Sequence, residues 1–188
     1  MRLAPIDAPR GLLTRFAYRA SKKRLGKVIA PLSTVYGRVP KSLKLSWEMS
    51  KFVESGLSID KDLQFLIQGL IARLNGCTFR IDIGEAMAHH EGAAARIAYV
   101  EDFEADGRFT DAERAALRYV REVTATHQAS DETFAALKAH FNDQEIVEIT
   151  LLNAIENFWN LTNLPLGIES DQLCALAGLP EPSVLAQA

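Results

Sequence analysis

Apolar residues recur along most of the chain at intervals of three and four positions, the spacing that places them on one face of an α-helix. In the clearest case, residues 63–74, the apolar stripe ends at Asn75 and Gly76, a common helix stop. The period-two alternation typical of β-strands, followed by a hairpin turn, is not found in the sequence. In the first half of the chain the pattern predicts helices over residues 11–27, 40–55, 63–74, 77–92 and 93–104.

Capping residues mark the helix starts in the second half of the chain. Thr110, with Glu113 three residues later, forms a capping box. Ser130, Asn142 and Ser170 are also residue types that accept hydrogen bonds from a first helical turn. These signals predict helices over residues 110–128, 131–141, 143–162 and 171–177. Because helices joined by short loops form bundles, we expect an all-α fold.

Basic and acidic side chains are unevenly distributed along the chain. Residues 1–45 carry eleven basic residues and one acidic residue, a net charge of +10, and the remainder carries ten basic and twenty-three acidic residues, a net charge of −13. We therefore divide the chain into a basic helical arm (1–38), a main helical domain (39–180) and a C-terminal tail (181–188).

The charge of the arm predicts that it lies on an acidic surface of its own or a neighbouring subunit. Binding of nucleic acid or of a membrane surface is the less favoured alternative, since its basic residues also accompany apolar ones. The apolar residues expected to pack with the arm are Leu12, Leu13, Phe16 and Leu25.

The overall composition, with 48% hydrophobic and 24% charged residues, is that of an ordinary globular protein. No apolar run approaches the roughly 18 residues needed to cross a bilayer, and the N-terminus lacks the pattern of a secretory signal. The two cysteines, Cys77 and Cys174, lie far apart and indicate no disulfide framework. We therefore expect a soluble, cytoplasmic protein.

Cys77 is the candidate for thiol chemistry. It follows a helix break and stands at the start of a predicted helix, where unpaired N–H groups and the helix dipole favour a thiolate. Arg80, one turn later, would add to this effect if it faces the sulfur. The alternative is that Cys77 is a small buried hydrophobic residue, as a lone cysteine usually is.

Other candidate residues have simpler structural explanations. Glu85 and His89 share one helical face, but surface ion pairing explains that spacing as well as metal binding does, and we predict no metal site. His127 ends an apolar helix face, and we favour a C-terminal cap over a catalytic base. The sequence has no Gly-rich phosphate loop and no hydrolase or zinc-protease motif, so no cofactor is expected.

The long helix over residues 143–162 has one polar and one apolar half. The polar half is either a solvated outer face or the wall of a small-molecule pocket, since its asparagines lie close to Trp159. Its members are Glu145, Glu148, Asn153, Glu156, Asn157 and Asn160, and those of the apolar half are Val147, Leu151, Ala154, Ile155, Phe158 and Leu161.

Residues 74–84 read LNGCTFRIDIG and follow an apolar helix. This run resembles the alkyl hydroperoxidase D-like (AhpD-like) branch of the carboxymuconolactone decarboxylase family, in which an Asn-Gly turn leads into Cys-x-x-Cys. The resemblance spans about residues 40–168 and implies an AhpD-like helical bundle, to which the basic arm is an N-terminal extension. Further segments that resemble the family are residues 109–114, 146–149 and 153–157.

The resemblance also assigns roles to four positions, three of which are replaced here. Cys77 matches the first cysteine of the family's pair, whereas Arg80 stands at the second, which attacks peroxide. Gly84 stands at a histidine four residues further on, and Phe65 at a glutamate twelve residues before the first cysteine. A dithiol peroxidase needs a thiolate, a second sulfur and a proton relay, and these replacements supply none of them.

The leading hypothesis is a protein that keeps the family's scaffold, has lost dithiol peroxidase activity, and binds or transforms a small, largely apolar molecule near Cys77. The family also includes decarboxylases that lack the Cys-x-x-Cys pair, so other catalysis stays open. One alternative is a single-thiol peroxide or thiol-redox enzyme that uses Cys77 with Arg80. Another is a non-catalytic oligomeric protein whose basic arm docks on a partner. The residues expected to contact the small molecule are Phe65, Gln68, Gly84, Asn153 and Asn157.

A homo-oligomer is expected on two grounds. Residues 63–74 and 146–161 carry more large apolar side chains than a small bundle needs. The resemblance implies trimers or their multiples, with a dimer as the alternative.

Overall fold

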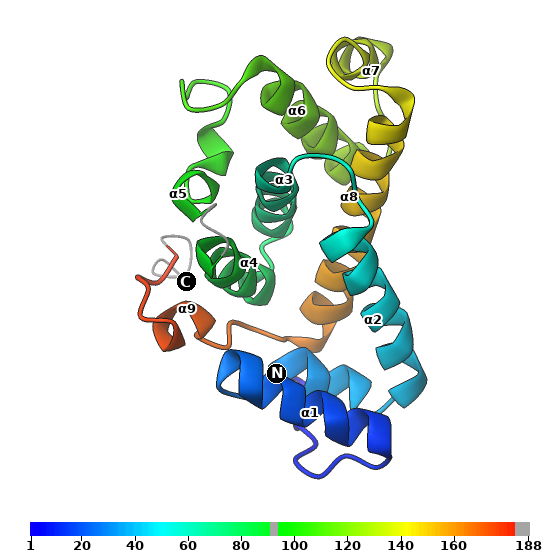
Figure 1. The fold of residues 1–188 in the computed structure, drawn as a ribbon, viewed down its shortest axis with the longest axis vertical. Coiled ribbons are helices and arrows are strands. Elements are labelled where there is room, and N and C mark those ends of the chain that lie inside the picture. The colour runs from blue at the N-terminus through cyan, green and yellow to red at the C-terminus, as the bar shows by residue number, and fades with distance from the viewer. Residues whose placement is uncertain (91–93, 183–188) are drawn as a thin grey trace.

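The most apolar helix, α3 (Lys61–Leu74), lies at the centre of the fold, with the other helices around it (Figure 1). The computed structural model describes residues 1–90 and 94–182, and over these residues the chain is helical with no β-strand, as the sequence predicts. None of the helices in these two ranges is long and apolar enough to cross a membrane.

The remaining long helices are α1 (Leu12–Leu25), α2 (Pro40–Ser55), α4 (Thr78–His90), α6 (Asp111–Thr126), α7 (Asp131–Lys138) and α8 (Asp143–Asn163). The short elements are the π-helix η1 (Leu32–Tyr36), α5 (Ala94–Ile97), the 3-10 turns η2 (Val100–Asp102) and η3 (Leu164–Leu166), and α9 (Leu173–Leu176).

Aliphatic side chains of α3 form the main core. Leu66, Ile67, Leu70 and Ile71 are each at most 2% exposed, and α3 packs against α4, α6 and α8. Full burial of each such side chain contributes about 1.5–3 kcal/mol. Because this stripe is covered inside one chain, its apolar character needs no second subunit to explain it.

The predicted N-cap residues of three helices, α6, α7 and α8, are confirmed. Thr110 and Asn142 begin α6 and α8 with complete capping boxes, in which Glu113 and Glu145 bond back to the capping residue. Ser130 caps α7 through its hydroxyl. Both partners of these bonds lie within one helical turn, so the local sequence determines them.

Two predicted helices, over residues 93–104 and 171–177, differ from the structure. The helix expected over residues 93–104 is wrong, because α5 ends at Ile97 and a 3-10 turn follows. Ser170 does not cap α9, since its hydroxyl donates to Asp82 Oδ2 at 2.9 Å and α9 begins only after Gln172. The same hydroxyl also accepts the Gln172 N–H at 3.0 Å, so Ser170 bonds to both a tertiary and a local partner without capping α9.

Three further boundaries concern short or undescribed segments. The π-helix η1 was not predicted, because its five residues are too few to show a periodic pattern. The expected end of the fourth helix at residues 91–92 and most of the expected tail, residues 183–188, lie outside the described residues.

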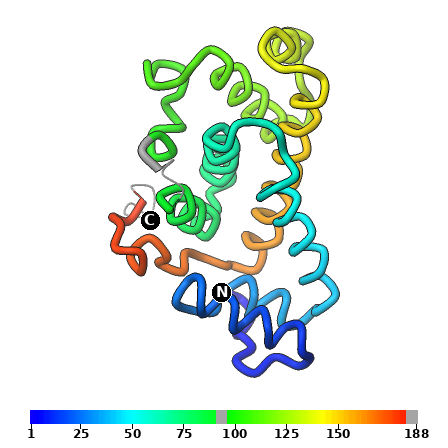
Figure 2. Tube along the Cα trace, in the orientation of Figure 1, coloured from blue at the N-terminus to red at the C-terminus, as the bar shows by residue number. Residues whose placement is uncertain are grey.

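The basic arm, residues 1–38, packs on its own chain beside the segment that follows α8 (Figure 2). Lys27 Nζ lies 2.7 Å from Asp171 Oδ1, and the Ala30 N–H donates to Asp171 Oδ2 at 2.6 Å. The Arg2 N–H donates to the carbonyl of Leu166 at 2.8 Å. Charge and backbone hydrogen bonds together hold the arm to the bundle.

The apolar contacts expected of the arm are mostly wrong. Leu12, Leu13 and Phe16 are exposed, and of the four expected residues only Leu25 packs against a core cluster. The inner face of α1 instead carries small and polar side chains, because Tyr18 and Ser21 bond backbone carbonyls of the arm. The buried residues of α1 are Thr14, Ala17, Tyr18 and Ser21.

The polar half of the long helix α8 is not a solvated outer face, which was one of the two interpretations of the sequence. Five of its polar side chains are buried, and four of its large apolar ones lie on the surface. The buried polar residues are Glu148, Asn153, Glu156, Asn160 and Asn163, and the exposed apolar ones are Val147, Leu151, Phe158 and Leu161. Burial of so many polar groups requires hydrogen-bond partners, which the fold supplies for most of these atoms, although Asn160 Oδ1 has none.

Glu148 shows how such a partner set stabilises the fold. Its Oε2 accepts the N–H groups of Ser58 at 2.7 Å and Ile59 at 3.1 Å, just before α3 begins, and its Oε1 accepts from Gln144 at 2.8 Å. Burial raises the pKa of Glu148, but the hydrogen bonds from Gln144, Ser58 and Ile59 together lower it by more, so the net shift is downward.

We expect Glu148→Gln to lower the free energy of unfolding at pH 7 by about 1.5–3 kcal/mol, because charge-assisted hydrogen bonds are lost. The folded-state pKa lies below the ordinary value of about 4.3. The carboxylate therefore stabilises the fold above that pH, and this stability is lost as the pH falls through the folded-state pKa. Urea unfolding at pH 7 and at about pH 3 checks this, with the exposed Glu132→Gln as control. An equal difference at both pH values would contradict it.

Candidate functional site

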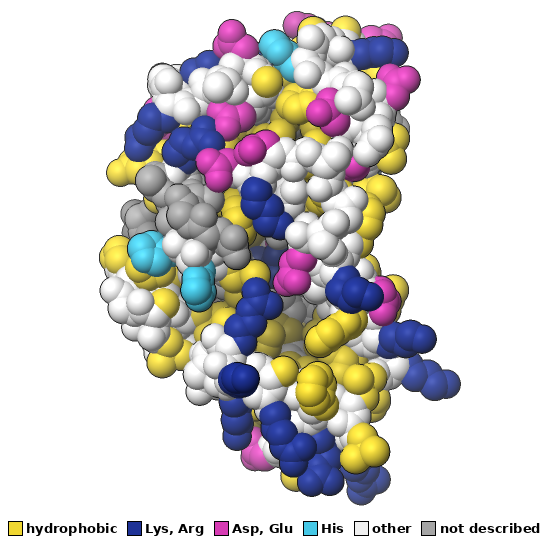
Figure 3. Space-filling model, in the orientation of Figure 1, with side chains coloured by type: hydrophobic (Ala, Val, Ile, Leu, Met, Phe, Trp, Pro, Cys, Tyr) yellow, Lys and Arg dark blue, Asp and Glu magenta, His cyan; other side chains and the backbone are white. Residues whose placement is uncertain are grey.

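A cleft opens between the arm, α2, α3, α4 and the C-terminal end of α8. It has a lobe of about 320 Å³ and an overlapping lobe of about 310 Å³, sizes that suit a small ligand. In Figure 3 this face is hollowed, with hydrophobic side chains in the hollow and basic ones beside it. The apolar lining comes mainly from Val53 of α2, Phe79, Ile83 and Met87 of α4, and Trp159 of α8.

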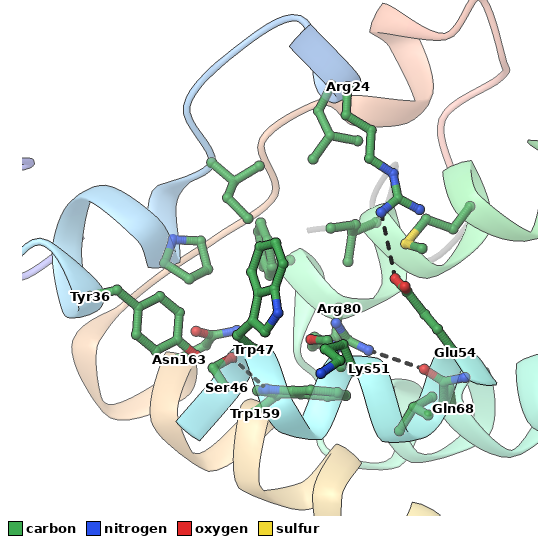
Figure 4. A pocket seen from close by; sticks show the side chains of 18 residues that line it. Arg24, Tyr36, Ser46, Trp47, Lys51, Glu54, Gln68, Arg80, Trp159 and Asn163 are labelled. Atoms are coloured by element: carbon green, nitrogen blue, oxygen red, sulfur yellow. Dashed lines mark hydrogen bonds and ion pairs between the residues drawn. The ribbon is translucent and has the colours of Figure 1, made fainter. Parts of the chain in front are cut away.

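Arg80 lies at the floor of the cleft and is held by Glu156. Its Nε lies 2.7 Å from Glu156 Oε1 and its Nη2 lies 2.5 Å from Glu156 Oε2, a bidentate geometry. The Glu156 side chain is fully buried, and Asn160 donates a further hydrogen bond to Oε1 at 2.8 Å. The guanidinium carbon stands 4.7 Å from the ring centroid of Trp159, a cation–π contact (Figure 4).

The ion pair keeps Arg80 charged inside the protein. Burial lowers the pKa of Arg80, but the charge and hydrogen bonds of Glu156 raise it by more, so the net shift is upward. Because two of its three nitrogens bond Glu156, the guanidinium has a fixed orientation on the cleft floor.

The positions expected to contact a ligand lie partly in this cleft. Phe65, Gln68 and Gly84 line the second lobe together with Arg80. A Cβ atom built at Gly84 meets nothing within 4 Å, so this position is open space where the family pattern has a histidine. The structure thus gathers the three replaced positions, 65, 80 and 84, around one cavity.

Cys77 lies behind the cleft wall and does not line either lobe. It immediately precedes α4, as expected, but the side chain is fully buried among Phe79, Ile83 and Ile168. Burial raises its pKa more than hydrogen bonds and the charge of Arg80 lower it. The expected lowering by the helix start is present as the backbone hydrogen bond of Arg80, but desolvation outweighs it.

Polar contacts from two cleft residues, the Arg80 backbone and the Asn163 side chain, reach Cys77. The Asn163 side-chain amide lies 4.0 Å from the Cys77 sulfur, and Asn163 itself lines the first lobe. Cys174 is also buried, donates to the Asp82 carbonyl at 3.3 Å, and has its pKa raised to about 12 by burial. Neither thiol has the exposure that a reactive cysteine needs.

The structure does not bring His127, Asn153 or Asn157 to the cleft. His127 is the exposed C-cap of α6, with a left-handed φ of 63°, in agreement with the capping interpretation. Asn153 donates to the Val120 carbonyl and to Thr124 on α6, at 3.2 Å each. The amide of Asn157 is equally occupied, with Asn153 and Asn75 as partners. The expected pocket wall of asparagines is therefore wrong, since these amides join helices to one another.

Glu85 is likewise used within the fold. It pairs with the buried Arg73 of α3, rather than with His89, because Arg73 has a 1% exposed side chain and needs a counter-charge. Burial raises the pKa of Glu85 more than Arg73 lowers it. This pairing explains Glu85 without a metal ion.

Several cleft residues had no signal in the sequence. Tyr36 comes from the π-helix of the arm, and Ser46, Trp47 and Lys51 come from α2. The sequence indicates Trp159 only as a neighbour of asparagines. In the structure its Nε1 donates to Ser46 at 3.2 Å, and its ring lies on the floor of the cleft. These residues are far apart in sequence, so only the packing of the arm and α2 on α8 reveals them.

No protein-family model matches the chain. It is 27% identical over 158 residues to the uncharacterized protein YnjA of Escherichia coli (strain K12). The match covers 82% of this chain and 86% of YnjA.

Solved structures with the same fold were also found. A protein of unknown function from Agrobacterium tumefaciens, proposed to be the antioxidant defence protein AhpD, matches with a TM-score of 0.67 and 28% identity, over 72% of this chain and 95% of that protein. The debrominase Bmp8, as a cysteine-to-alanine variant in complex with 2,3,4-tribromopyrrole, matches with a TM-score of 0.80 and 17% identity, over 94% of this chain and 95% of Bmp8. At that identity the second match shows a shared fold.

The buried ion pair makes a specific prediction for stability. Arg80→Leu should lower the free energy of unfolding by about 3–5 kcal/mol, because it leaves the carboxylate of Glu156 buried without a counter-charge. The double variant Arg80→Leu with Glu156→Leu should lose less, since no uncompensated charge remains. Urea unfolding at pH 7 measures both.

The exposed ion pair of Arg24 with Glu54, at 3.5 Å on the cleft rim, provides the matched control. Arg24→Leu should change the unfolding free energy by at most about 1 kcal/mol. Equal losses in the single and double variants at positions 80 and 156 would contradict the argument.

Proposed function

We propose that this chain, which has the all-α fold of the AhpD-like, peroxidase-related proteins, binds a small, largely apolar molecule in the cleft above Arg80 and has lost dithiol peroxide reduction. The observation that carries the proposal is the Arg80–Glu156 pair at the position of the family's second cysteine. An arginine fixed in this way turns a redox position into a floor for ligand binding.

The surroundings of the thiols support the loss of peroxide chemistry. Reduction of a peroxide begins with attack by a thiolate, and the resulting sulfenic acid must then be resolved by a second thiol. Burial raises the pKa of both Cys77 and Cys174, and Arg80 occupies the place of the attacking sulfur. The single-thiol alternative, Cys77 with Arg80, is less favoured because the guanidinium already bonds Glu156 in bidentate fashion.

The lining of the cleft supports a small, largely apolar ligand. Phe79, Ile83 and Met87 provide apolar surface, and both tryptophans of the chain, Trp47 and Trp159, face the same space. The debrominase with the same fold has been crystallised with a brominated pyrrole, a compact ring of low polarity. We propose a ligand of comparable size here.

The contacts of the arm bear on the third hypothesis, a docking arm without catalysis. Arg24, Leu25, Ile29 and Tyr36 of the arm line the cleft, and Asp171 anchors the arm to the same chain. These contacts favour a role for the arm as one wall of the ligand site.

We expect peroxide reduction with dithiothreitol as donor and tert-butyl hydroperoxide as substrate to stay at the uncatalysed rate. Cys77→Ser should leave that rate unchanged, since the buried thiol takes no part. The residual peroxide is measured directly. Turnover that disappears in Cys77→Ser would overturn the proposed loss of activity.

Ligand binding is testable by intrinsic fluorescence, because the only two tryptophans line the cleft. Titration with ethylbenzene, a compact apolar probe, should change the tryptophan emission in a saturable way. Gly84→Phe should weaken binding about tenfold or more by filling the second lobe, where the added side chain meets open space. Gly107→Phe, at an equally open position outside the cleft, is the control. Identical binding by both variants would count against the cleft as the site.

We also propose that the chain self-associates through the outer face of α8. Val147, Leu151, Phe158 and Leu161 form one stripe on that helix, and each is at least 37% exposed. A contiguous apolar stripe of this kind is typical of a protein–protein contact. The closed assemblies implied by the family resemblance make a second copy of the chain the expected partner.

Substitution of one stripe residue tests this assembly. Leu161→Glu should shift the protein towards the 20.8 kDa monomer in sedimentation velocity at micromolar concentration, because it buries a charge in the contact. Leu176→Glu is the matched control, since Leu176 lies on α9 with nearly the same exposure, 60% against 63%. A wild-type protein that sediments only as a monomer would refute the proposal.

A further inference from the structure

The floor of the cleft presents two hydrogen-bond donors that the fold itself does not use. Arg80 bonds Glu156 through Nε and Nη2, and Nη2 also reaches Gln68 at 3.4 Å. Among the described residues no acceptor bonds its third nitrogen, Nη1, and this atom is not among the buried atoms that lack a partner. Nη1 therefore keeps access to the cleft that Arg80 lines.

The second donor is the hydroxyl of Tyr36. Tyr36 is 8% exposed and lines the same lobe, and Figure 4 shows its ring directed toward Ser46 and Asn163. A hydrogen bond from Ser46 acts on the Tyr36 oxygen and lowers the pKa of this group, whereas no acceptor among the described residues takes the proton of the Tyr36 hydroxyl. Tyr36 and Arg80 line the same lobe, so the two donors share one cavity.

Two other polar groups of the floor have partners within the fold. Ser46 Oγ accepts the Trp159 indole N–H at 3.2 Å, and Gln68 donates to the Gln64 carbonyl at 3.2 Å. Phe79, Ile83 and Trp159 supply apolar surface to the same lobe. A ligand in this lobe thus meets apolar surface beside a polar floor with donors to spare.

The charge balance of the floor decides which acceptor fits. Glu156 neutralises Arg80 at hydrogen-bond distance, so the pair carries no net charge toward the ligand. An ionised carboxylate would give up its hydration in an apolar lobe without gaining a net opposite charge, which costs more than the hydrogen bonds return. Burial raises the pKa of Tyr36 more than Ser46 and Arg80 lower it, so its hydroxyl stays a donor at neutral pH.

We infer that Tyr36 and Arg80 Nη1 together receive one uncharged acceptor oxygen of the ligand, so that the ligand class is a small, neutral carbonyl compound with an apolar body. This inference rests on the proposed function, because it specifies the ligand of the same cleft. It gives the arm a direct part in specificity, since Tyr36 belongs to the π-helix of the arm.

Three probes of similar size separate the terms of the inference. Acetophenone carries a neutral carbonyl, ethylbenzene replaces it with a methylene, and benzoate carries a carboxylate. Calorimetric and fluorescence titrations of the full chain should give acetophenone a dissociation constant about tenfold lower than ethylbenzene and benzoate, the size of effect expected for well-placed hydrogen bonds.

Removal of one donor should act mainly on one probe. Tyr36→Phe should weaken acetophenone binding about tenfold and leave ethylbenzene binding unchanged, because it removes a hydroxyl and keeps the ring. Arg80→Lys, which keeps the positive charge and removes the guanidinium fork, should weaken acetophenone binding more than it weakens ethylbenzene binding. Tyr119→Phe is the matched control, since the Tyr119 hydroxyl pairs with Thr150 at 2.8 Å away from the cleft and its loss should change neither probe.

The outcomes distinguish this inference from the proposed function. If acetophenone and ethylbenzene bind equally, and Tyr36→Phe affects neither, the inference is overturned and the apolar site stands. Tightest binding by benzoate would also overturn it, since the floor would then recognise a carboxylate. Failure of every probe to bind would overturn both the inference and the proposed function.

Discussion

The bidentate ion pair between Arg80 and Glu156 is the interaction on which the site depends. It joins α4 to α8 at the centre of the molecule, and a fully buried carboxylate is stable there only because the guanidinium and Asn160 satisfy it. The same pair fixes the plane of the guanidinium against Trp159 and so sets the floor of the cleft. Arginine thus fills a position where the family pattern has a sulfur, and it lies on the floor of the cleft.

A second constraint is the orientation of α8, which buries polar residues and exposes apolar ones. Its inward face meets the N–H groups before α3 through Glu148, the guanidinium of Arg80 through Glu156, and α6 through Asn153. Each contact pairs a buried polar side chain of α8 with another part of the chain, so together they favour one rotation of the helix. The apolar stripe on the opposite side follows as a consequence, and the fold leaves it uncovered within one chain.

The arm completes the cleft through a relay of contacts that begins at α4. Asp82 of α4 accepts the N–H groups of Asp171, Leu173 and Cys174, which holds the C-terminal segment against the bundle. Asp171 then binds Lys27 and the Ala30 N–H, just before the π-helix that carries Tyr36. Two carboxylates far apart in sequence therefore place the arm, and the arm supplies one wall of the cleft.

The sequence by itself determined the helical class, the positions of most helices and the capping boxes at Thr110 and Asn142, because periodicity and capping are properties of neighbouring residues. It also identified Phe65, Arg80 and Gly84 as replaced positions, and these meet in the cleft. Only the tertiary structure decided that Cys77 is sealed behind the wall and that Tyr36 and Trp47 belong to the site. It alone decided the rotation of α8 as well, since a wheel of polar and apolar halves does not say which half has buried partners. The physical reason is that desolvation and pairing of polar groups depend on contacts between residues distant in sequence, which no local pattern encodes.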